Sequence, residues 1–431
     1  MGKKLLILGS DFSTVHLVEE AKKMGVYVIV TDLMTTSPTK EIADEAWNIS
    51  TTDIEILIKK IKEENIDGIL AGASEFNIEN CREICKRLDL PLYCSSDNAW
   101  EVSRNKRKFK DLCLKHGVRV AEDYHLNDEL SEDSLKNIKY PVVVKPVDKS
   151  GNRGMSYCNN KEELIEGYKK ARAISDNENI IVEKQLKGGE YTGYYVIADG
   201  EIVLSYYTSM HHEPRMAENL YSIEYISSCH LKQYLEEVNE PLIKVFKDAG
   251  CKNGIAWTEL MYDNDGHFYA LEMGHRFAGP GIYAVHEKIS GFNTYKWMIE
   301  FALGKEHKKS DLPKPLDSAY IKCAGAYDLF TTHEAVVDKM EGLDEVLKLN
   351  NVVIDMPKRQ GDSVRANVNM GIVKIYGKDC EEMCDTIKKV NELLTITDES
   401  GDNIYIHYTD FETLRKEYKE GLIQFEVVDK E

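Results

Sequence analysis

Two things are scarce in this 431-residue sequence: long apolar runs and positive charge. No apolar stretch is long enough to cross a bilayer, which excludes an ordinary membrane-spanning helix. The 74 acidic residues outnumber the 55 lysines and arginines and give a formal net charge of −19. Such a surface repels a phosphate backbone, and we therefore expect neither nucleic acid nor membrane as a partner. Residues 1–9 are too short for a secretion signal and instead predict a first strand.

The ten cysteines form neither a disulfide framework nor a recognisable zinc motif. They are scattered through a large chain, which predicts reduced thiols and a cytoplasmic protein. Cys81 and Cys85, like Cys380 and Cys384, lie four residues apart on predicted helices. Because no histidine or further cysteine lies near them at zinc-site spacing, we interpret them as packed or surface thiols.

The glycines of a dinucleotide-binding fingerprint are also missing. Residues 1–100 alternate strand and helix signals, which predicts a Rossmann-like α/β unit with a parallel sheet. Its first turn has one glycine, Gly9, where the fingerprint needs three. Asp32 ends the second strand as a ribose-binding acid would, but a single acid does not restore an NAD site. The expected strands are 4–9, 26–31, 68–71 and 91–94, and the expected helices are 14–24, 54–64 and 79–88.

The rest of the chain mixes antiparallel strands with helices. Strands are expected at 140–146, 180–185, 191–198 and 201–208, and helices at 106–116, 161–175 and 231–249. Residues 305–315 are charged, contain two prolines and predict a linker. Beyond this linker we expect an α+β unit with strands 321–324, 352–354 and 371–376 and helices 379–394 and 410–420.

The most informative segment is a predicted hairpin at 254–281, whose turn is residues 263–266. Each strand carries one carboxylate, Glu259 and Glu272, and Arg276 follows the second strand. Two registers are open: either residue 259 opposes 270 with Glu272 one diagonal step away, or Glu259 opposes Glu272 directly. In both registers the carboxylates share one face, where a divalent cation would remove their repulsion. The alternative is a half-exposed hairpin whose glutamates face water.

Two further segments are suited to binding a nucleotide. Lys145 ends an apolar strand and precedes the glycine-containing turn 148–154, whose backbone N–H groups can cover phosphates. Residues 183–186 lie at the end of another strand, where exposed backbone can bind an adenine edge, with Leu186 against the ring and Glu190 on the ribose. Taken singly, these residues are better explained as a lysine with its ammonium in water and as ordinary surface charges.

The order of these features resembles the ATP-grasp superfamily, and specifically its carboxylate–amine ligase branch, which includes L-amino-acid ligases. Asn105-Lys106 resembles its first nucleotide lysine, and Lys145 with Gly151 and Gly154 its second lysine and phosphate-covering loop. Residues 182–186, with Glu183, Lys184 and Leu186, resemble its adenine hinge. Glu259, Glu272 and Arg276 resemble its two magnesium ligands and its anion-holding arginine.

The resemblance implies a preliminary α/β domain at 1–100, a two-lobed ATP-grasp domain at 101–305 and a C-terminal α+β domain at 315–431. It implies ATP and Mg²⁺, with Mn²⁺ as an alternative, and small-molecule substrates. A homodimer is expected because dimers are common among the proteins that the chain resembles. In one respect the chain departs from the pattern: two residues after the second glutamate the family usually has an asparagine, and this chain has Gly274.

The implied activity is ligation of a carboxylate to an amine through an acyl phosphate. Arg276 and Lys145 would stabilise the transferred phosphoryl group. Two loops are candidates for contacting the substrates: His211 and His212 for the acceptor, and Gly279 for the acyl phosphate through backbone amides. The alternatives are another ATP-grasp reaction, either carboxylation or purine-pathway ligation, a nucleotide-binding protein without catalysis, and an NAD-dependent oxidoreductase, which the first turn disfavours.

Overall fold

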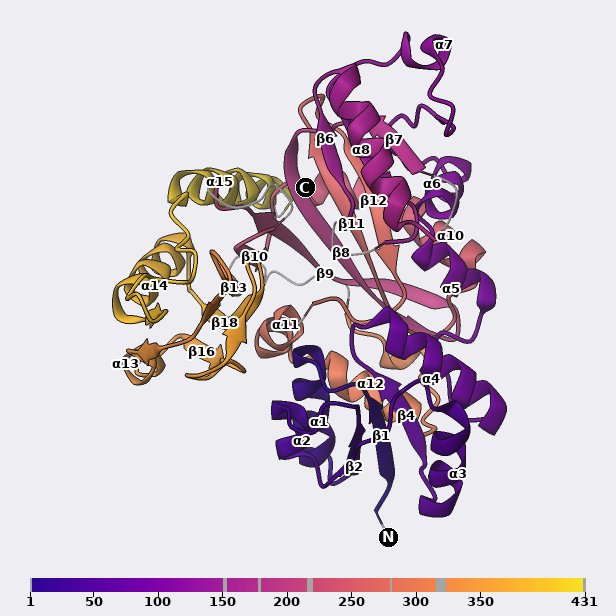
Figure 1. Cartoon of the computed structure of the whole chain (residues 1–431), viewed down its shortest axis with the longest axis vertical. Coiled ribbons are helices and arrows are strands. Elements are labelled where there is room, and N and C mark those ends of the chain that lie inside the picture. The colour runs from indigo at the N-terminus through magenta and orange to yellow at the C-terminus, as the bar shows by residue number, and fades with distance from the viewer. Residues whose placement is uncertain are drawn as a thin grey trace.

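The computed structural model describes residues 2–149, 153–176, 180–214, 220–279, 281–314 and 323–428. Its parts are an N-terminal parallel sheet, a small antiparallel lobe and a large antiparallel sheet that reaches into the C-terminal region (Figure 1). All ten cysteines are free and buried. Within the described ranges, no helix combines the length and the apolar character that crossing a bilayer requires.

The N-terminal sheet confirms the predicted α/β unit. Its four parallel strands lie in the order β3 (Glu45–Trp47), β2 (Tyr27–Thr31), β1 (Lys4–Leu8) and β4 (Gly68–Ala71). The apolar run of β1 is buried from Leu5 to Leu8, as in a helix-covered parallel sheet. The helices of this unit are α1 (Val15–Lys23), α2 (Pro38–Ile42), α3 (Ile54–Glu64), α4 (Glu75–Leu88) and α5 (Asp97–Arg104), with a 3-10 turn at Phe12–Thr14.

The predicted strand at 91–94 is wrong. This segment has no strand, and its last two residues form a turn before α5. Tyr93 is buried against the start of β11 (Gly254–Asp263), where a side chain at Gly254 would come within 2.8 Å of the tyrosine ring. The apolar residues here are therefore core contacts, which periodicity cannot distinguish from a short buried strand.

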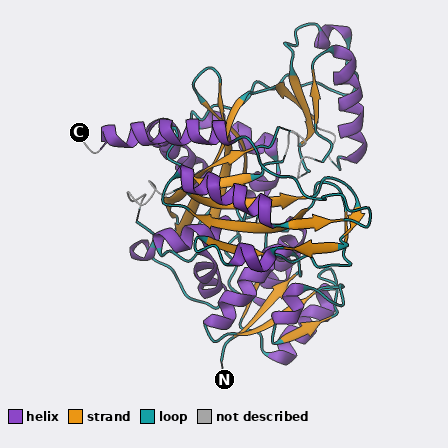
Figure 2. Cartoon of the chain, turned by 90° about the vertical axis from the view of Figure 1, so that its left-hand side faces the viewer, coloured by secondary structure: helices purple, strands orange, loops and turns teal. Residues whose placement is uncertain are grey.

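The small lobe is a three-stranded antiparallel sheet, in the order β6 (Ser156–Cys158), β5 (Val142–Pro146), β7 (Ile180–Lys184), with α8 (Lys161–Ile174) packed on it. Figure 2 shows it standing apart from the large sheet. Two more helices, α6 (Lys106–Lys115) and α7 (Glu132–Leu135), belong to this part of the chain. The Asn105 side chain accepts hydrogen bonds from the backbone N–H groups of Arg107 and Lys108, which caps α6 and fixes Lys106 in its first turn.

The large sheet has eight antiparallel strands. Their order is β12 (Phe268–Gly274), β11, β8 (Gly188–Ala198), β9 (Glu201–His211), β10 (Ile223–Ile226), β13 (Ala324–Phe330), β18 (Asn369–Tyr376) and β16 (Val352–Asp355). The predicted hairpin of β8 and β9 is confirmed. Because β10 pairs with β13, the sheet continues without a break from the hairpin region into the C-terminal part.

The remaining elements cover this framework. The predicted helix 231–249 consists of α9 (Leu231–Gln233), a π-helical segment (Tyr234–Asn239) and α10 (Glu240–Ala249). Helices α11 (Ile282–Ser290) and α12 (Thr294–Ala302) return to the N-terminal core, and a 3-10 turn follows at Lys309–Asp311. The C-terminal part adds β14 (Ala335–Val336) paired with β17 (Ser363–Val364), β15 (Lys339–Glu341) paired with β19 (Thr395–Thr397), α13 (Leu343–Leu347), α14 (Cys380–Leu393) and α15 (Phe411–Val428). Residues 321–322 of the predicted strand 321–324 lie outside the described residues.

Candidate active site

The hairpin of β11 and β12 brings its two carboxylates face to face. Near the turn the strands pair regularly as far as Leu260 opposite Ala270. Leu271 then forms a one-residue bulge, and Glu259 pairs directly with Glu272. This is the second of the two pairings that the sequence left open, and a bulge produces it. Residues opposite each other in an antiparallel pair share one face, so both carboxylates point to the same side of the sheet.

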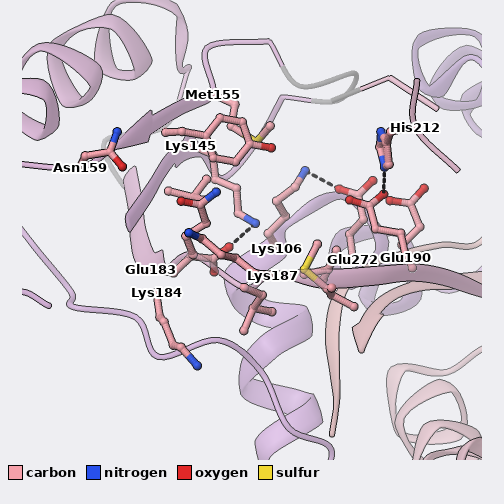
Figure 3. A pocket seen from close by; sticks show the side chains of 18 residues that line it. Lys106, Lys145, Met155, Asn159, Glu183, Lys184, Lys187, Glu190, His212 and Glu272 are labelled. Atoms are coloured by element: carbon pink, nitrogen blue, oxygen red, sulfur yellow. Dashed lines mark ion pairs between the residues drawn. The ribbon is translucent and has the colours of Figure 1, made fainter. Parts of the chain in front are cut away.

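A cavity of about 490 Å³ lies between this carboxylate face and the small lobe (Figure 3). It brings together most of the residues that the sequence singled out, although they come from several different elements and loops. Of the predicted site residues, the cavity is lined by Lys106, Lys145, Glu183, Lys184, Leu186, Glu190, His212, Glu259 and Glu272.

Both predicted nucleotide lysines point into the cavity and contact carboxylates (Figure 3). Lys106 Nζ lies 2.6 Å from Glu272 Oε2, and Lys145 Nζ lies 2.5 Å from Glu183 Oε1. Glu183 is shared with a second buried lysine, Lys110. Burial, reinforced by Lys110 and Lys106, lowers the pKa of Lys145 well below its usual range. A bound polyanion would therefore stabilise the charged form of Lys145.

The two hairpin carboxylates have different electrostatic environments. Burial, together with the neighbouring charges of Glu272 and Glu190, raises the pKa of Glu259 well above its ordinary value. Burial also acts to raise the pKa of Glu272, but Lys106 outweighs it and lowers that pKa. Among the described residues, Glu259 has no ion-pair or hydrogen-bond partner. The half-buried pair thus offers adjacent carboxylate oxygens, a donor set that fits Mg²⁺ or Mn²⁺.

Arg276 lies at the edge of this site and is held by the N-terminal unit. Its Nη2 is 3.0 Å from Glu75 Oε1 on α4, and its Nη1 donates to the Phe277 carbonyl at 2.8 Å. Its guanidinium also lies over the Trp257 ring, 4.9 Å from the centroid. Together with Lys106 and Glu272, Arg276 lines a small space of about 20 Å³ beside the main cavity. No sequence signal pointed to Glu75, which lies 201 residues before its partner.

The position of Trp257 also explains why residue 274 is a glycine. Trp257 pairs across the hairpin with Gly274, and its indole fills the space above the glycine. A Cβ at position 274 would lie 2.3 Å from Trp257 Cε2 and 2.5 Å from its Nε1. The metal-ligand side chain expected at this position in the ATP-grasp pattern therefore has no room. Any metal held here must rely on the Glu259–Glu272 pair.

The predicted hinge residues divide between the cavity and its rim. Leu186 and Lys184 both line the cavity, but the Lys184 ammonium points away from its centre and lies 2.8 Å from Asp263 Oδ2 (Figure 3). Glu190 Oε2 lies 3.3 Å from His212 Nε2. Burial tends to lower the pKa of His212, but Glu190 outweighs it and raises that pKa. His212 therefore faces the predicted ribose-binding acid.

Several predicted residues are not brought to this cavity. His211 is buried, with its Nε2 2.9 Å from Glu417 Oε2 on α15, and faces away from the cavity. Gly154 is next to α8, where an added Cβ would lie 2.6 Å from Ile174 Cδ1. Gly279 lies in the loop after β12, and the atom nearest to a Cβ there is the Tyr221 hydroxyl at 3.9 Å. Gly151 lies outside the described residues.

Other lining residues were missed. Met261 could have been predicted from the sequence, because it lies two residues after Glu259 and strand alternation places it on the same face. The bulged Leu271 had no sequence signal. The additional residues are Val143, Met155, Tyr157, Asn159, Lys187, Gly188, Met261 and Leu271.

Comparison with known proteins agrees with this geometry. Residues 105–310 match the family model described as "Carbamoyl-phosphate synthase L chain, ATP binding domain". The formate-dependent phosphoribosylglycinamide formyltransferase of Prochlorococcus marinus (strain MED4) is 33% identical over 165 residues, which are 38% of this chain and 42% of that protein. The match thus spans less than half of that relative. Its counterpart from Sulfurisphaera tokodaii is 24% identical over 408 residues, 92% of this chain and 97% of that protein.

Solved structures show the same fold. The L-amino acid ligase from Bacillus licheniformis has a TM-score of 0.76 at 19% identity, covering 92% of this chain and 99% of that one. The biotin carboxylase domain dimer of the Hydrogenobacter thermophilus 2-oxoglutarate carboxylase, in complex with MgADP, ADP and bicarbonate, has a TM-score of 0.75 at 17% identity, covering 97% and 94%.

The fold and the cavity define an α/β protein in which a small lobe faces an acidic sheet across a charged cleft. Residues 105–310 form an ATP-grasp domain, the type of domain that the order of the sequence motifs predicted.

Proposed function

We propose that the protein is an ATP-dependent ligase that activates a carboxylate as an acyl phosphate and transfers the acyl group to an amine. One observation carries this proposal: a lysine pair and a carboxylate pair face each other in one cavity. Lys106 and Lys145 would hold the ATP phosphates, and residues 183–186 the adenine. Glu259 and Glu272 would hold Mg²⁺, which neutralises phosphate charge when bound.

In the first step an oxygen of the substrate carboxylate attacks the γ-phosphorus, the bond to the β-phosphate oxygen breaks, and ADP leaves. Phosphoryl transfer needs positioning and charge neutralisation more than covalent help from the protein. Arg276 would supply positive charge to the transferred group, since it is held rigidly between Glu75 and the Phe277 carbonyl. In the second step the amine nitrogen attacks the acyl carbon, phosphate leaves, and the nitrogen loses a proton.

The predicted organisation is part of this proposal: an α/β domain at 1–100, the nucleotide and metal site at 101–305, and a C-terminal α+β domain at 315–431. The carboxylate and amine would enter from the side of Arg276 and Gly279. A homodimer is supported by the similar biotin carboxylase domain, whose solved structure is a dimer.

A second candidate is formate-dependent formylation of phosphoribosylglycinamide. The Sulfurisphaera tokodaii relative, which aligns with 92% of this chain, carries the name of that reaction. The L-amino acid ligase, similar in fold over a comparable share of the chain, supports an amino-acid acceptor instead. Both candidates use the same phosphoryl-transfer site and differ in the acceptor.

The test is an ADP-release screen that crosses carboxylic acids, formate included, with amino acids and other amines. Turnover that requires one acid, one amine and Mg²⁺ supports the proposal. Glu272→Ala should reduce turnover by about 100-fold or more, whereas Asp265→Ala, in the turn of the same hairpin, should leave it unchanged. Absence of nucleotide binding, or an unaltered rate in Glu272→Ala with the fold intact, would overturn the proposal.

A further inference from the structure

Three side chains of different chemistry meet on the opposite side of the large sheet from the nucleotide cavity. The Sγ of Cys229, a ring nitrogen of His230 and a carboxylate oxygen of Glu420 all lie within 4.8 Å of one another. Cys229 and His230 follow β10 in the turn that leads to α9, and Glu420 lies on α15. Residues far apart in the sequence therefore form one cluster, to which the proposed ligase chemistry assigns no role.

The fold holds α15 tightly against this turn. A Cβ at Gly421 would lie 2.4 Å from Ser228 Oγ and 2.9 Å from the Cys229 nitrogen, so only glycine allows the helix to come this close. One turn earlier on the same helix, Glu417 lies 2.9 Å from His211 Nε2. The carboxylate of Glu420 is thereby placed beside the thiol by packing.

The cluster also has a free nitrogen donor and room for a further ligand. The ring of His230 is stacked on Tyr262, with centroids 3.7 Å apart, and makes no hydrogen bond within the described part of the chain. His230 and Glu420 line a second cavity of about 570 Å³, which shares Gly188 and His212 with the nucleotide cavity. A ligand atom from solvent can therefore reach the cluster.

We propose that Cys229, His230 and Glu420 bind Zn²⁺, with water in the fourth position. One sulfur, one nitrogen and one oxygen form the mixed donor set that Zn²⁺ accepts and Mg²⁺ does not. Bonds of about 2.0 to 2.3 Å in tetrahedral geometry put ligand atoms roughly 3.3 to 3.8 Å apart, so small side-chain movements close the site. On binding, the thiol releases its proton to solvent and the sulfur coordinates as thiolate. The metal would join α15 to the β10–α9 turn.

The test uses the full-length protein, stripped of metal and titrated with Zn²⁺ against a chromophoric chelator in excess Mg²⁺. One Zn²⁺ per chain is expected. With Co²⁺ in place of Zn²⁺, a thiolate-to-cobalt charge-transfer band should appear. Cys229→Ser should abolish that band and weaken Zn²⁺ binding by more than about tenfold. Cys251→Ser is the matched control, because Cys251 is equally buried in the same core cluster but is not part of this site.

Two results would overturn the proposal: wild-type protein that takes up no Zn²⁺, or a Cys229→Ser variant that keeps the cobalt band. If Cys229→Ser does not fold, Glu420→Gln provides the same measurement, since this exposed residue can be changed without disturbing the core. Glu420→Gln should weaken Zn²⁺ binding while the charge-transfer band remains, and an unchanged affinity would contradict the assignment. Glu412→Gln, at an exposed position of the same helix, is its control.

Discussion

An asparagine at position 274 would match the ATP-grasp pattern, yet we expect Gly274→Asn to lower the stability and the activity of this protein. The new Cβ would lie 2.3, 2.4 and 2.5 Å from three atoms of the Trp257 indole. Trp257 is only 4% exposed, and the Arg276 guanidinium lies over its ring, so the indole has little space to yield. Overpacking of a core typically costs about 1 to 3 kcal/mol. Displacing the indole also removes the surface that orients Arg276.

We therefore expect Gly274→Asn to lower the Tm and to slow ADP release, although it adds a potential metal ligand. The diagnostic measurement is a double-mutant cycle with Trp257→Ala. Because the clash exists only when both side chains are present, the double variant should be more stable than the sum of the two single effects by more than about 1 kcal/mol. Gly291→Asn is the control, since that glycine has no atom within 4 Å of a Cβ and a left-handed backbone that asparagine tolerates. A Gly274→Asn variant with unchanged Tm and faster turnover would show that the indole moves freely and would refute this reasoning.

Two other predictions concern residues of the same site, and a third concerns an ion pair of His16 elsewhere in the structure. Glu259→Gln should raise the Tm of the apo-protein at alkaline pH by removing repulsion between buried carboxylates, while ADP release falls by about tenfold or more; lower stability would contradict the repulsion argument. Arg276→Lys cannot contact Glu75 and a carbonyl with one planar group, so kcat should fall with little change in the KM for ATP; an equal rise in KM would indicate a binding role instead. His16 Nε2 lies 2.7 Å from Asp355 Oδ2, and Asp355 and Glu19 outweigh burial and raise the pKa of His16 above 6.5. A raised histidine pKa gives stability that is present below pH 6.5 and lost as the pH rises through the raised value, so Tm-against-pH curves should show this loss in the wild type and not in His16→Gln.

The sequence predicted those features that depend on local pattern. The parallel N-terminal sheet follows from alternating apolar strands and helices, and the convergence of Glu259 with Glu272 follows from a turn signal and period-two alternation. The bulge at Leu271 was not predictable, because neither the turn signal nor the alternation marks where an extra residue enters a strand. The contact between Arg276 and Glu75 escaped prediction for a related reason: it joins two units that are distant in sequence, and neither residue carries a mark of its partner.

The continuous large sheet shows a different limit. Charge and proline content marked 305–315 as a linker, and the pattern after it indicated a separate unit. In the structure, β10 and β13 pair directly, and α11 and α12 pack into the N-terminal core. The charge and proline content of a linker indicates only that this segment is exposed to solvent. It carries no information about which strand edge the chain joins afterwards, because backbone hydrogen bonding between strands has little dependence on side-chain identity.

The ion pairs of the cavity connect nucleotide binding with metal binding. Lys106 is the cation in contact with Glu272, and a phosphate that draws Lys106 away leaves Glu272 beside Glu259 without its ion-pair partner. A metal ion alone must displace Lys106 from the same carboxylate and leave its ammonium without a carboxylate partner. Binding of either the metal or the triphosphate alone therefore carries an electrostatic cost that the other ligand removes. The phosphates provide a new partner for Lys106, and the metal neutralises the two glutamates. Lys145 differs from Lys106 in this respect. When Lys145 turns to the phosphates, its partner Glu183 still has an ion pair with Lys110. If the proposed site binds both ligands, linkage requires that the metal and the triphosphate raise each other's affinity by the same factor, and we expect Lys106 to carry this coupling.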